Sequence, residues 1–213
     1  MALPAILQRL FRRPPLALDF VGYEVLVDFI REKSLHRLDG DLVEIGAFMG
    51  GGTAKLARFA AGYGKRIFAI DIFDPAADTT KSRNGTPMSQ IYLAYLEGGS
   101  QRDAYRNAIR GLDNVVTIDE DSSSVSFPPE QRFVFGFIDG NHRPEYVQND
   151  FDLVWPSLVP GGALGFHDYN SELPEVTACI DRIVAGHAAE ITETREIAAR
   201  HILLLVKGSR SVC

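Results

Sequence analysis

Two patterns of apolar and polar residues alternate along the chain. Short apolar runs predict strands, and apolar residues at helical spacing predict helices. Short apolar runs predict five buried strands, at residues 41–46, 65–71, 114–121, 133–140 and 163–169. Apolar residues at helical spacing predict five helices, at residues 21–34, 53–64, 101–112, 143–158 and 172–186. Strands that alternate with helices favour a parallel sheet with helices on both faces.

The last part of the chain departs from this alternation. Two strand patterns, at residues 190–197 and 201–208, follow each other with only a few residues between them, which predicts an antiparallel pair. We therefore expect one α/β domain over residues 1–213, built on a Rossmann-like, doubly wound sheet of seven strands. The sheet should be mostly parallel, with an antiparallel C-terminal strand.

Two segments lie outside the periodic pattern. Residues 1–20 form an N-terminal extension, which we expect to be a short docking helix or a frayed end, or else a helix that covers the site or a partner. Residues 72–100 form a long irregular insertion, and loops of this length are usually functional or disordered. This insertion follows the second strand, so we expect it on the ligand side of the sheet. Its Arg83, Tyr92 and Tyr95 could contact a substrate, or could belong to a solvated lid with a helix docked by its tyrosines.

Composition narrows the function classes. Of the 213 residues, 46% are hydrophobic, which is enough for one sizeable core. The net charge of -6 argues against general binding to nucleic acid or to anionic membranes. No apolar run reaches transmembrane length, and residues 1–20 do not resemble a secretion signal. Cys179 and Cys213 form neither a metal-type spacing nor a disulfide framework, so a reducing, cytoplasmic location fits best.

The stretch EIGAFMGGGT, residues 44–53, is the strongest candidate for a binding site. The first predicted strand delivers these glycines to the carboxyl edge of the sheet, where open parallel sheets bind ligands. The helix that begins at Thr53 offers free N–H groups and a positive dipole end, which suit an anion.

Two common ligands fit this stretch poorly. A triphosphate loop requires a lysine before Thr53, but glycines occupy that place. A dinucleotide fingerprint requires a glycine where Phe48 stands. The remaining pattern is Glu44, then Gly46, then Gly50, and its wider loop could admit an amino-acid carboxylate and a sulfonium group.

Four segments in order carry a resemblance to a known family: VEIGAFMGGGT, IFAID, IDEDSSS and FIDGNHRPEYVQNDFDLVWPSLVPGGALGFHDY. Together they resemble the class I S-adenosylmethionine-dependent methyltransferases. The last segment resembles most specifically the methyltransferase domain 24 group, which includes macrocin O-methyltransferase and cephalosporin-tailoring proteins. Catechol O-methyltransferases are more distant relatives. The likeness covers roughly residues 22–207.

The resemblance implies S-adenosylmethionine as cofactor and assigns residues to it. Asp71 stands where the family has an acid that bonds the ribose hydroxyls, and a carboxylate can accept two hydrogen bonds from such a diol. Asp121 and Ser122 would bracket the adenine. The glycine stretch, with Glu44, Gly46, Gly50 and Thr53, would hold the amino-acid end.

Two acids indicate where chemistry would occur. Asp139 and Asp168 end the fourth and fifth predicted strands, and adjacent strand ends should place both carboxylates at one rim. Hard carboxylate oxygens suit Mg²⁺ first, with Mn²⁺ or Ca²⁺ also suitable. In related metal-dependent methyltransferases, acids at these places hold a metal. Here His167 precedes Asp168, which makes His167 a candidate third ligand and adds Fe²⁺ to the candidate ions.

His142 follows Asp139 by three residues, where the catechol-type enzymes have a lysine acting as general base. A histidine titrates near working pH and could take that role, with Asp139 beside it. Tyr169 and Asn170 could line an acceptor pocket, or could be ordinary loop residues.

The resemblance therefore implies an O-methyltransferase acting on a hydroxyl of a small molecule, such as a sugar of a secondary metabolite or polysaccharide, or a phenol. Two alternatives remain open at this stage: a catalytically silent cofactor-binding subunit of a tailoring complex, and an NAD-dependent oxidoreductase. A homodimer is compatible with the sequence.

Overall fold

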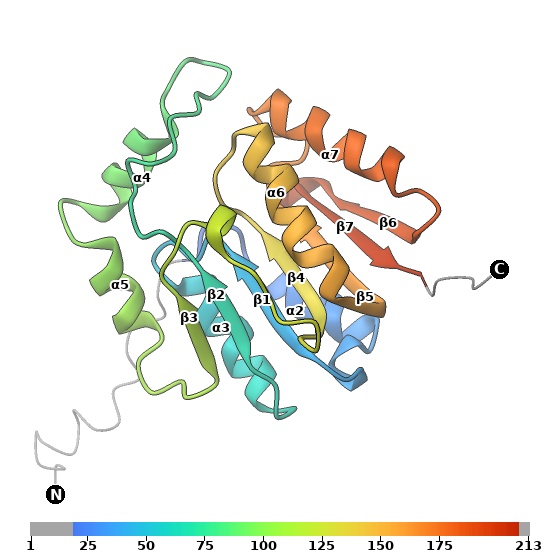
Figure 1. Cartoon of the computed structure of the whole chain (residues 1–213). Coiled ribbons are helices and arrows are strands. Elements are labelled where there is room, and N and C mark those ends of the chain that lie inside the picture. Colours follow the sequence, from blue (N-terminus) through green and yellow to red (C-terminus); the bar gives the residue numbers. More distant parts are fainter. Residues whose placement is uncertain (1–18, 209–213) are drawn as a thin grey trace, which may run out of the picture.

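The structure, a computed structural model, describes residues 19–208 and contains one sheet of seven strands (Figure 1). Their bounds are β1 (Asp41–Ile45), β2 (Ile67–Ile70), β3 (Val115–Ile118), β4 (Phe133–Ile138), β5 (Leu158–Phe166), β6 (Ile191–Ile197) and β7 (Ile202–Lys207). The strand order is β3-β2-β1-β4-β5-β7-β6. β1 to β5 pair in parallel, whereas β7 is antiparallel to both β5 and β6. The predicted fold is therefore confirmed.

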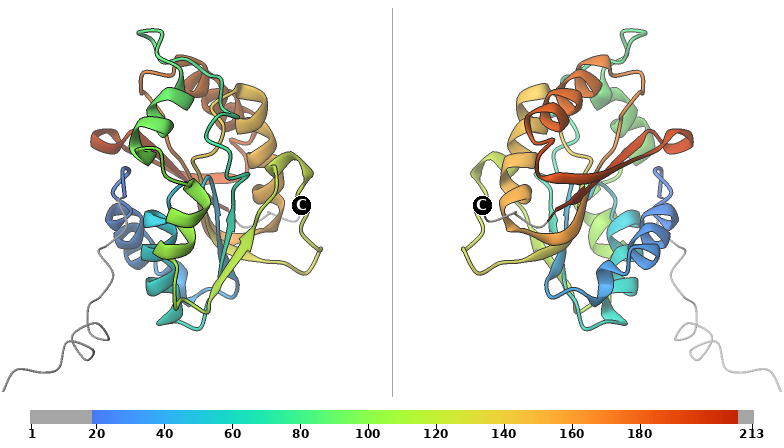
Figure 2. Two further views of the ribbon diagram at one scale, coloured as in Figure 1. Left: turned by 90° about the vertical axis from the view of Figure 1, so that its left-hand side faces the viewer. Right: turned by 90° about the vertical axis from the view of Figure 1, so that its right-hand side faces the viewer.

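Helices cover both faces of the sheet (Figure 2). One face carries α2 (Glu24–Glu32), α3 (Gly51–Ala61) and α5 (Gln101–Ala108), and the other carries α6 (Pro144–Val154) and α7 (Pro174–Gly186). Short 3₁₀ turns complete the described chain: η1 (Leu35–Arg37), η2 (Ser122–Ser124), η3 (Trp155–Ser157) and η4 (Ala198–Arg200). The arrangement is the doubly wound one that alternating strands and helices favour.

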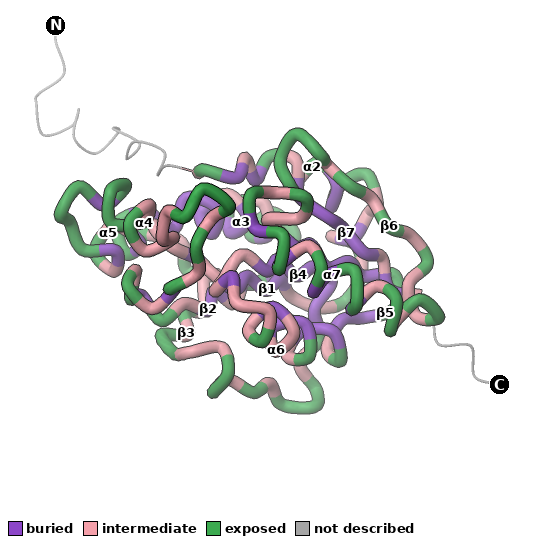
Figure 3. Tube along the Cα trace, turned by 90° about the horizontal axis from the view of Figure 1, so that it is seen from above, coloured by how far each residue is buried: buried purple, intermediate pink, exposed green. Residues whose placement is uncertain are grey.

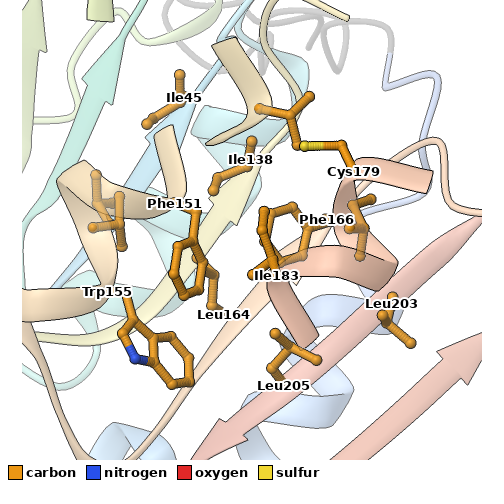
Figure 4. Close-up of a cluster of buried hydrophobic side chains, with 14 of the residues drawn as sticks. Ile45, Ile138, Phe151, Trp155, Leu164, Phe166, Cys179, Ile183, Leu203 and Leu205 are labelled. Atoms are coloured by element: carbon orange, nitrogen blue, oxygen red, sulfur yellow. The ribbon is translucent and has the colours of Figure 1, made fainter. Parts of the chain in front are cut away.

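Each face has its own apolar core. Under α6 and α7, Phe151 stacks on Trp155 and Phe166, and Leu164 and Leu205 lie beside them (Figure 4). A second cluster packs α2 and α3 against the opposite face. Seen from above, buried segments run through the middle of the molecule and exposed ones surround them (Figure 3). The inner strands β1, β2, β4 and β7 are almost wholly buried on both faces, whereas the edge strands β3 and β6 are only partly buried.

Several elements differ from their predicted extent. β5, for example, begins at Leu158, where the sequence predicted the end of a helix, and ends at Phe166. The helix α4 (Met88–Leu96) lies inside the insertion 72–100, where the sequence indicated an irregular piece with, as one alternative, a helix docked by its tyrosines. Its apolar residues surround the helix on all sides, so they show no helical period. α3 begins at Gly51 rather than Thr53, because glycines weaken helix propensity without preventing a first turn. The extension 1–20 lies outside the described residues except for its last two positions.

None of the helices among residues 19–208 is both long enough and apolar enough to cross a membrane.

The strand order places the candidate site. From β1 the chain winds outward through β2 to β3, and then crosses back to β4 on the other side of β1. Loops from adjacent strands therefore separate at the carboxyl ends of β1 and β4, and such switch points are where open α/β sheets bind ligands.

Candidate functional site

A cavity of about 300 Å³ lies at this switch point. The turn after β1 and the loops after β2, β3, β4 and β5 line it, together with residues of α4. Eight of the predicted site residues border this cavity: Gly46, Asp71, Asp121, Ser122, Asp139, His142, His167 and Asp168. The predicted cofactor and reaction residues thus meet in one space.

The glycine turn is shaped by close contact with the protein itself. Gly46 has a φ of +90°, and a Cβ there would lie 2.0 Å from the main-chain oxygen of Asp139. A Cβ on Gly52 would lie 2.3 Å from the ring of Tyr23. Only glycine allows these approaches, which leave a bare main-chain turn facing the cavity. Gly50 does not border the cavity and packs against Tyr105 of α5 instead.

Glu44 and Thr53 lie beneath this turn rather than in the cavity. Both are fully buried, and the Thr53 hydroxyl donates a short hydrogen bond to Glu44 Oε2. Glu44 Oε1 has no hydrogen-bond partner. Burial raises the pKa of Glu44 to about 8, although hydrogen bonds from Thr53 and Tyr23 oppose the shift. The hydrogen bond between Glu44 in β1 and Thr53 in α3 thus joins the two elements on either side of the glycine turn.

Asp71 lies at the end of β2 and borders the cavity. Its carboxylate accepts hydrogen bonds from the main-chain N–H of Phe48 at 2.8 Å, from that of Phe73 at 2.6 Å, and from Gln101 Nε2 at 3.1 Å. Burial raises its pKa above the usual range, against the effect of these bonds. The carboxylate is thus held rigidly between two loops. Oδ1 accepts the bonds from Phe73 and Gln101, whereas Oδ2 accepts, of these three, only that from Phe48 and keeps a lone pair for a ligand.

Asp121 and Ser122 border the cavity where β3 ends. The Asp121 carboxylate caps the short turn η2, accepting from Ser123 N–H at 2.9 Å, and it also accepts from Tyr146 Oη at 3.0 Å. The Ser123 hydroxyl, which donates to Asp121 Oδ1 at 2.6 Å, lowers the pKa of Asp121 most, and the other two bonds lower it further.

A chain of histidines and carboxylates lies at the ends of β4 and β5. His142 Nε2 is 2.7 Å from Asp168 Oδ2. His167 Nδ1 is 3.1 Å from that same oxygen and 2.9 Å from Asp139 Oδ1. Two imidazoles therefore alternate with two carboxylates, all four bordering the cavity.

Asp78 extends this chain, and sequence reasoning missed it. It comes from the insertion 72–100, is 5% exposed, and its Oδ2 lies 2.6 Å from His142 Nδ1. No periodicity or spacing marks this residue, because the irregular path of the insertion alone brings it to His142. Tyr92 of α4 joins the same group, with its hydroxyl 3.3 Å from His142 Nδ1.

The carboxylates hold both imidazoles in the protonated form. Burial alone would lower the pKa of His142, but hydrogen bonds to Asp168 and Asp78 raise it to about 10. For His167, burial is likewise outweighed by Asp139 and Asp168, and the pKa rises to about 11. Conversely, burial would raise the pKa of Asp168, but its two histidine partners hold it well below the usual range.

The same cluster fits a divalent cation. Asp139, His142 and Asp168 each offer one ligand atom, and these atoms lie within 4.8 Å of one another. Two carboxylates and one imidazole suit Mg²⁺ or Mn²⁺, and the imidazole also suits Fe²⁺. The structure groups His142 with the two acids, where the sequence indicated His167.

Aromatic side chains form the outer wall of the cavity. Phe48 lies 5.4 Å from Tyr92 and 5.9 Å from Phe20, measured between ring centroids, and Phe20 lies 4.2 Å from Tyr95. All four residues border the cavity. Tyr92 and Tyr95 were sequence candidates, whereas Phe20 and Phe48 were not. We call these four residues the aromatic wall.

Three other sequence candidates lie elsewhere. The main-chain N–H of Arg83 donates to Glu172 O at 2.9 Å, and Arg83 does not border the cavity. The Tyr169 hydroxyl donates to Asp181 at 2.8 Å, and the Asn170 amide donates to Glu196 at 3.0 Å. These two side chains therefore bridge β5 to α7 and β6 rather than lining the cavity.

Comparison with solved structures gives this fold several relatives. The O-methyltransferase NovP matches with a TM-score of 0.65 at 16% identity, over 89% of this chain and 80% of NovP. CalS11, a TDP-rhamnose 3'-O-methyltransferase of calicheamicin biosynthesis, matches with a TM-score of 0.62 at 15% identity, over 97% of this chain and 89% of its own. SAH-bound PaMTH1 from Podospora anserina matches with a TM-score of 0.56 at 14% identity, over 97% and 89%. At identities this low, the structural similarity establishes a shared fold and nothing more.

No curated protein sequence matches this chain. A family model described as a methyltransferase domain, in contrast, matches residues 43–169. The matched residues run from β1 to just past β5 and include both the glycine turn and the histidine–carboxylate cluster. The chain therefore belongs to this methyltransferase domain family and is a class I S-adenosylmethionine-dependent methyltransferase.

Proposed function

We propose that this methyltransferase acts on oxygen: it transfers the methyl group of S-adenosylmethionine to a hydroxyl of a small molecule. The observation that carries the proposal is the position of His142, Asp139 and Asp168 in the same cavity as the bare turn after β1. An alcohol is a poor nucleophile at neutral pH, so its methylation calls for a nearby base or cation, and this cluster offers both.

The donor would occupy the inner part of the cavity. The main-chain turn at Gly46 and the N-terminus of α3 would receive the amino-acid end, and Asp71 would accept hydrogen bonds from the ribose hydroxyls. Asp121 and Ser122 would lie beside the adenine. Glu44, Gly50 and Thr53 would act from outside the cavity, by holding the turn in shape.

The acceptor would lie between the histidine–carboxylate cluster and the aromatic wall. Flat aromatic faces pack favourably against the apolar face of a sugar ring or against a phenol. The wall thus favours a phenol, or a sugar of a secondary metabolite or polysaccharide.

The reaction would be an in-line displacement. The acceptor oxygen forms a bond to the methyl carbon, the carbon–sulfur bond breaks, and its electron pair stays on sulfur. The hydroxyl proton passes to His142 Nε2. His142 can accept this proton only when its pairing with Asp168 no longer keeps Nε2 protonated, so the carboxylate of Asp168 must be engaged elsewhere at that moment.

A divalent cation would meet that requirement, with Asp139 and Asp168 as its protein ligands. When bound, such an ion supplies Lewis-acid polarisation of the acceptor oxygen. Mg²⁺ is the first choice for the two carboxylates, and Mn²⁺ or Fe²⁺ would suit a site that also includes an imidazole.

The test uses methyl-labelled S-adenosylmethionine with a panel of catechol, nitrophenyl rhamnoside and nitrophenyl glucoside, each with Mg²⁺, with Mn²⁺ and with a chelator. Transfer of label to oxygen supports the proposal, and we expect His142→Gln to lower kcat roughly 100- to 10,000-fold. Calorimetry with the donor and its demethylated product runs in parallel. Tight cofactor binding without transfer to any tested hydroxyl would instead favour a silent partner subunit.

A further inference from the structure

Asp78 makes two separate hydrogen bonds that leave it a single orientation. Its Oδ1 accepts from the main-chain N–H of Thr80 at 2.9 Å, and its Oδ2 faces His142 Nδ1 at 2.6 Å. The side chain is 7% exposed and that of His142 is 6% exposed, so water does not compete for this bond. The contact is therefore a buried hydrogen bond at the cavity, not a surface ion pair.

The hydrogen bond to Asp78 determines which ring nitrogen of His142 is the N–H donor to the insertion. A carboxylate only accepts, so Nδ1 must donate to Asp78. Nε2 is left as the nitrogen that faces Asp168 and the cavity. An imidazole held this way presents one defined nitrogen, in one defined direction, to whatever occupies the site.

We propose that Asp78 is a positioning residue for His142, and that the insertion contributes it only when folded over the cavity. This inference rests on the proposed function, because it assigns His142 the proton. Asp78 touches no reacting atom in that scheme and acts through the imidazole alone.

The path of the insertion connects this role to the cofactor. The segment leaves β2 at Asp71, reaches His142 at Asp78, and continues into α4, whose Tyr92 also contacts His142. The segment is fastened at Thr80 O, which accepts from Met88 N–H at 2.9 Å, and at Arg83 N–H, which donates to Glu172 O at 2.9 Å. The proposed ribose acid and the positioning residue thus lie on one short, anchored stretch, so the segment that borders the donor also orients the base.

Asp78→Asn tests the proposal, because an amide keeps the size but has only one acceptor oxygen. Thr80 N–H requires that oxygen, so the NH₂ group faces His142 Nδ1. Asp74→Asn is the matched control. Asp74 belongs to the same segment and makes the same kind of turn, accepting from Ala76 N–H at 3.0 Å, but it has no histidine partner among the described contacts.

The first readout needs no methyl acceptor. In proton NMR of the complex with S-adenosylhomocysteine, the Nδ1–H of His142 should give a strongly downfield signal, identified by its loss in His142→Gln. We expect Asp78→Asn to abolish this signal, Asp78→Glu to restore it in part, and Asp74→Asn to leave it in place. A signal that persists in Asp78→Asn would overturn the proposal, whether or not the protein methylates any tested hydroxyl.

The second readout distinguishes a role of Asp78 in orienting His142 from a role in holding the cavity together. With the best acceptor of the panel, Asp78→Asn should lower kcat by roughly 100- to 10,000-fold, up to the loss that an orienting carboxylate causes in a histidine-dependent site. KM for the acceptor and Kd for S-adenosylhomocysteine should stay within threefold of wild type. An unchanged kcat, or a tenfold or greater loss of S-adenosylhomocysteine affinity, would reject the positioning role.

Discussion

At the scale of single residues, the site depends on polar groups that are buried although some of their atoms have no hydrogen-bond partner. Glu44 is the clearest case, since it is fully buried and its Oε1 lacks a partner. A carboxyl in this position favours its neutral form, because removing a charge from water is costly. The Glu44–Thr53 pair below the glycine turn is therefore sensitive to pH.

Glu44→Gln should make the protein more stable at alkaline pH. The folded-state pKa of about 8 lies above the ordinary value of 4.5, so folded protein binds more protons than unfolded protein between these limits. Stability from this group is complete below about pH 4.5 and is lost as pH rises through about 8. Urea unfolding at pH 5 and pH 8 should show the variant gaining roughly 2–4 kcal/mol relative to wild type on going to pH 8. Parallel pH profiles for the two proteins would contradict this assignment.

Gly46→Ala should damage both folding and cofactor binding. Its new Cβ would lie 2.0 Å from the Asp139 carbonyl oxygen at a φ of +90°, so the turn and the end of β4 would have to separate. We expect a loss of at least about 3 kcal/mol in unfolding free energy. Gly64→Ala is the matched control, with a positive φ of +67° and no atom within 4 Å, and it should cost only about 1 kcal/mol. If the two variants lost the same unfolding free energy in denaturant, the positive φ alone, and not the contact with Asp139, would account for the loss.

At the scale of elements, the strands and most helices could be predicted because each has a sharp period. β4 and the end of β5 are apolar runs, and acids within two residues of their ends must share one edge, which is why Asp139 and Asp168 could be paired from sequence. The tyrosines of the insertion suggested a docked helix, but the bounds of α4 could not be predicted, because its apolar residues face every direction. Asp78 and Phe20 reach the cavity through irregular segments, and no local pattern encodes such a path.

Phe151→Ala tests the core that holds α6 on the sheet. Its ring lies within 5.1 Å of Trp155 and 6.3 Å of Phe166, between centroids, and is almost fully buried. Truncation should cost about 3–5 kcal/mol. Asp152→Ala, the neighbouring exposed position on the same helix, should stay within about 0.5 kcal/mol. Chemical denaturation measures both, and a loss below about 1 kcal/mol for Phe151→Ala would mean the core closes around the gap.

At the scale of the whole molecule, one cavity joins loops from five strands, so a ligand that fills it should tie them together. S-adenosylhomocysteine at 100 times its Kd should add about 2.7 kcal/mol of stability, which corresponds to roughly a 5–10 °C rise in Tm. Asp71→Asn should lose most of this rise at the same concentration, because an amide accepts ribose hydroxyls less strongly. A full shift in that variant, measured by scanning calorimetry, would remove Asp71 from the proposed cofactor site.

The place of β7 between β5 and β6 also sets an order of assembly. During synthesis on the ribosome, β6 emerges before β7, yet among the described strands it pairs only with β7. β6 therefore has no hydrogen-bonded neighbour until β7 arrives, and β5 keeps one open side until then. Asp168 lies two residues after the end of β5, and the neighbouring Tyr169 N–H donates to His201 O just ahead of β7. The carboxylate of Asp168 should consequently take its final position among the last events of folding.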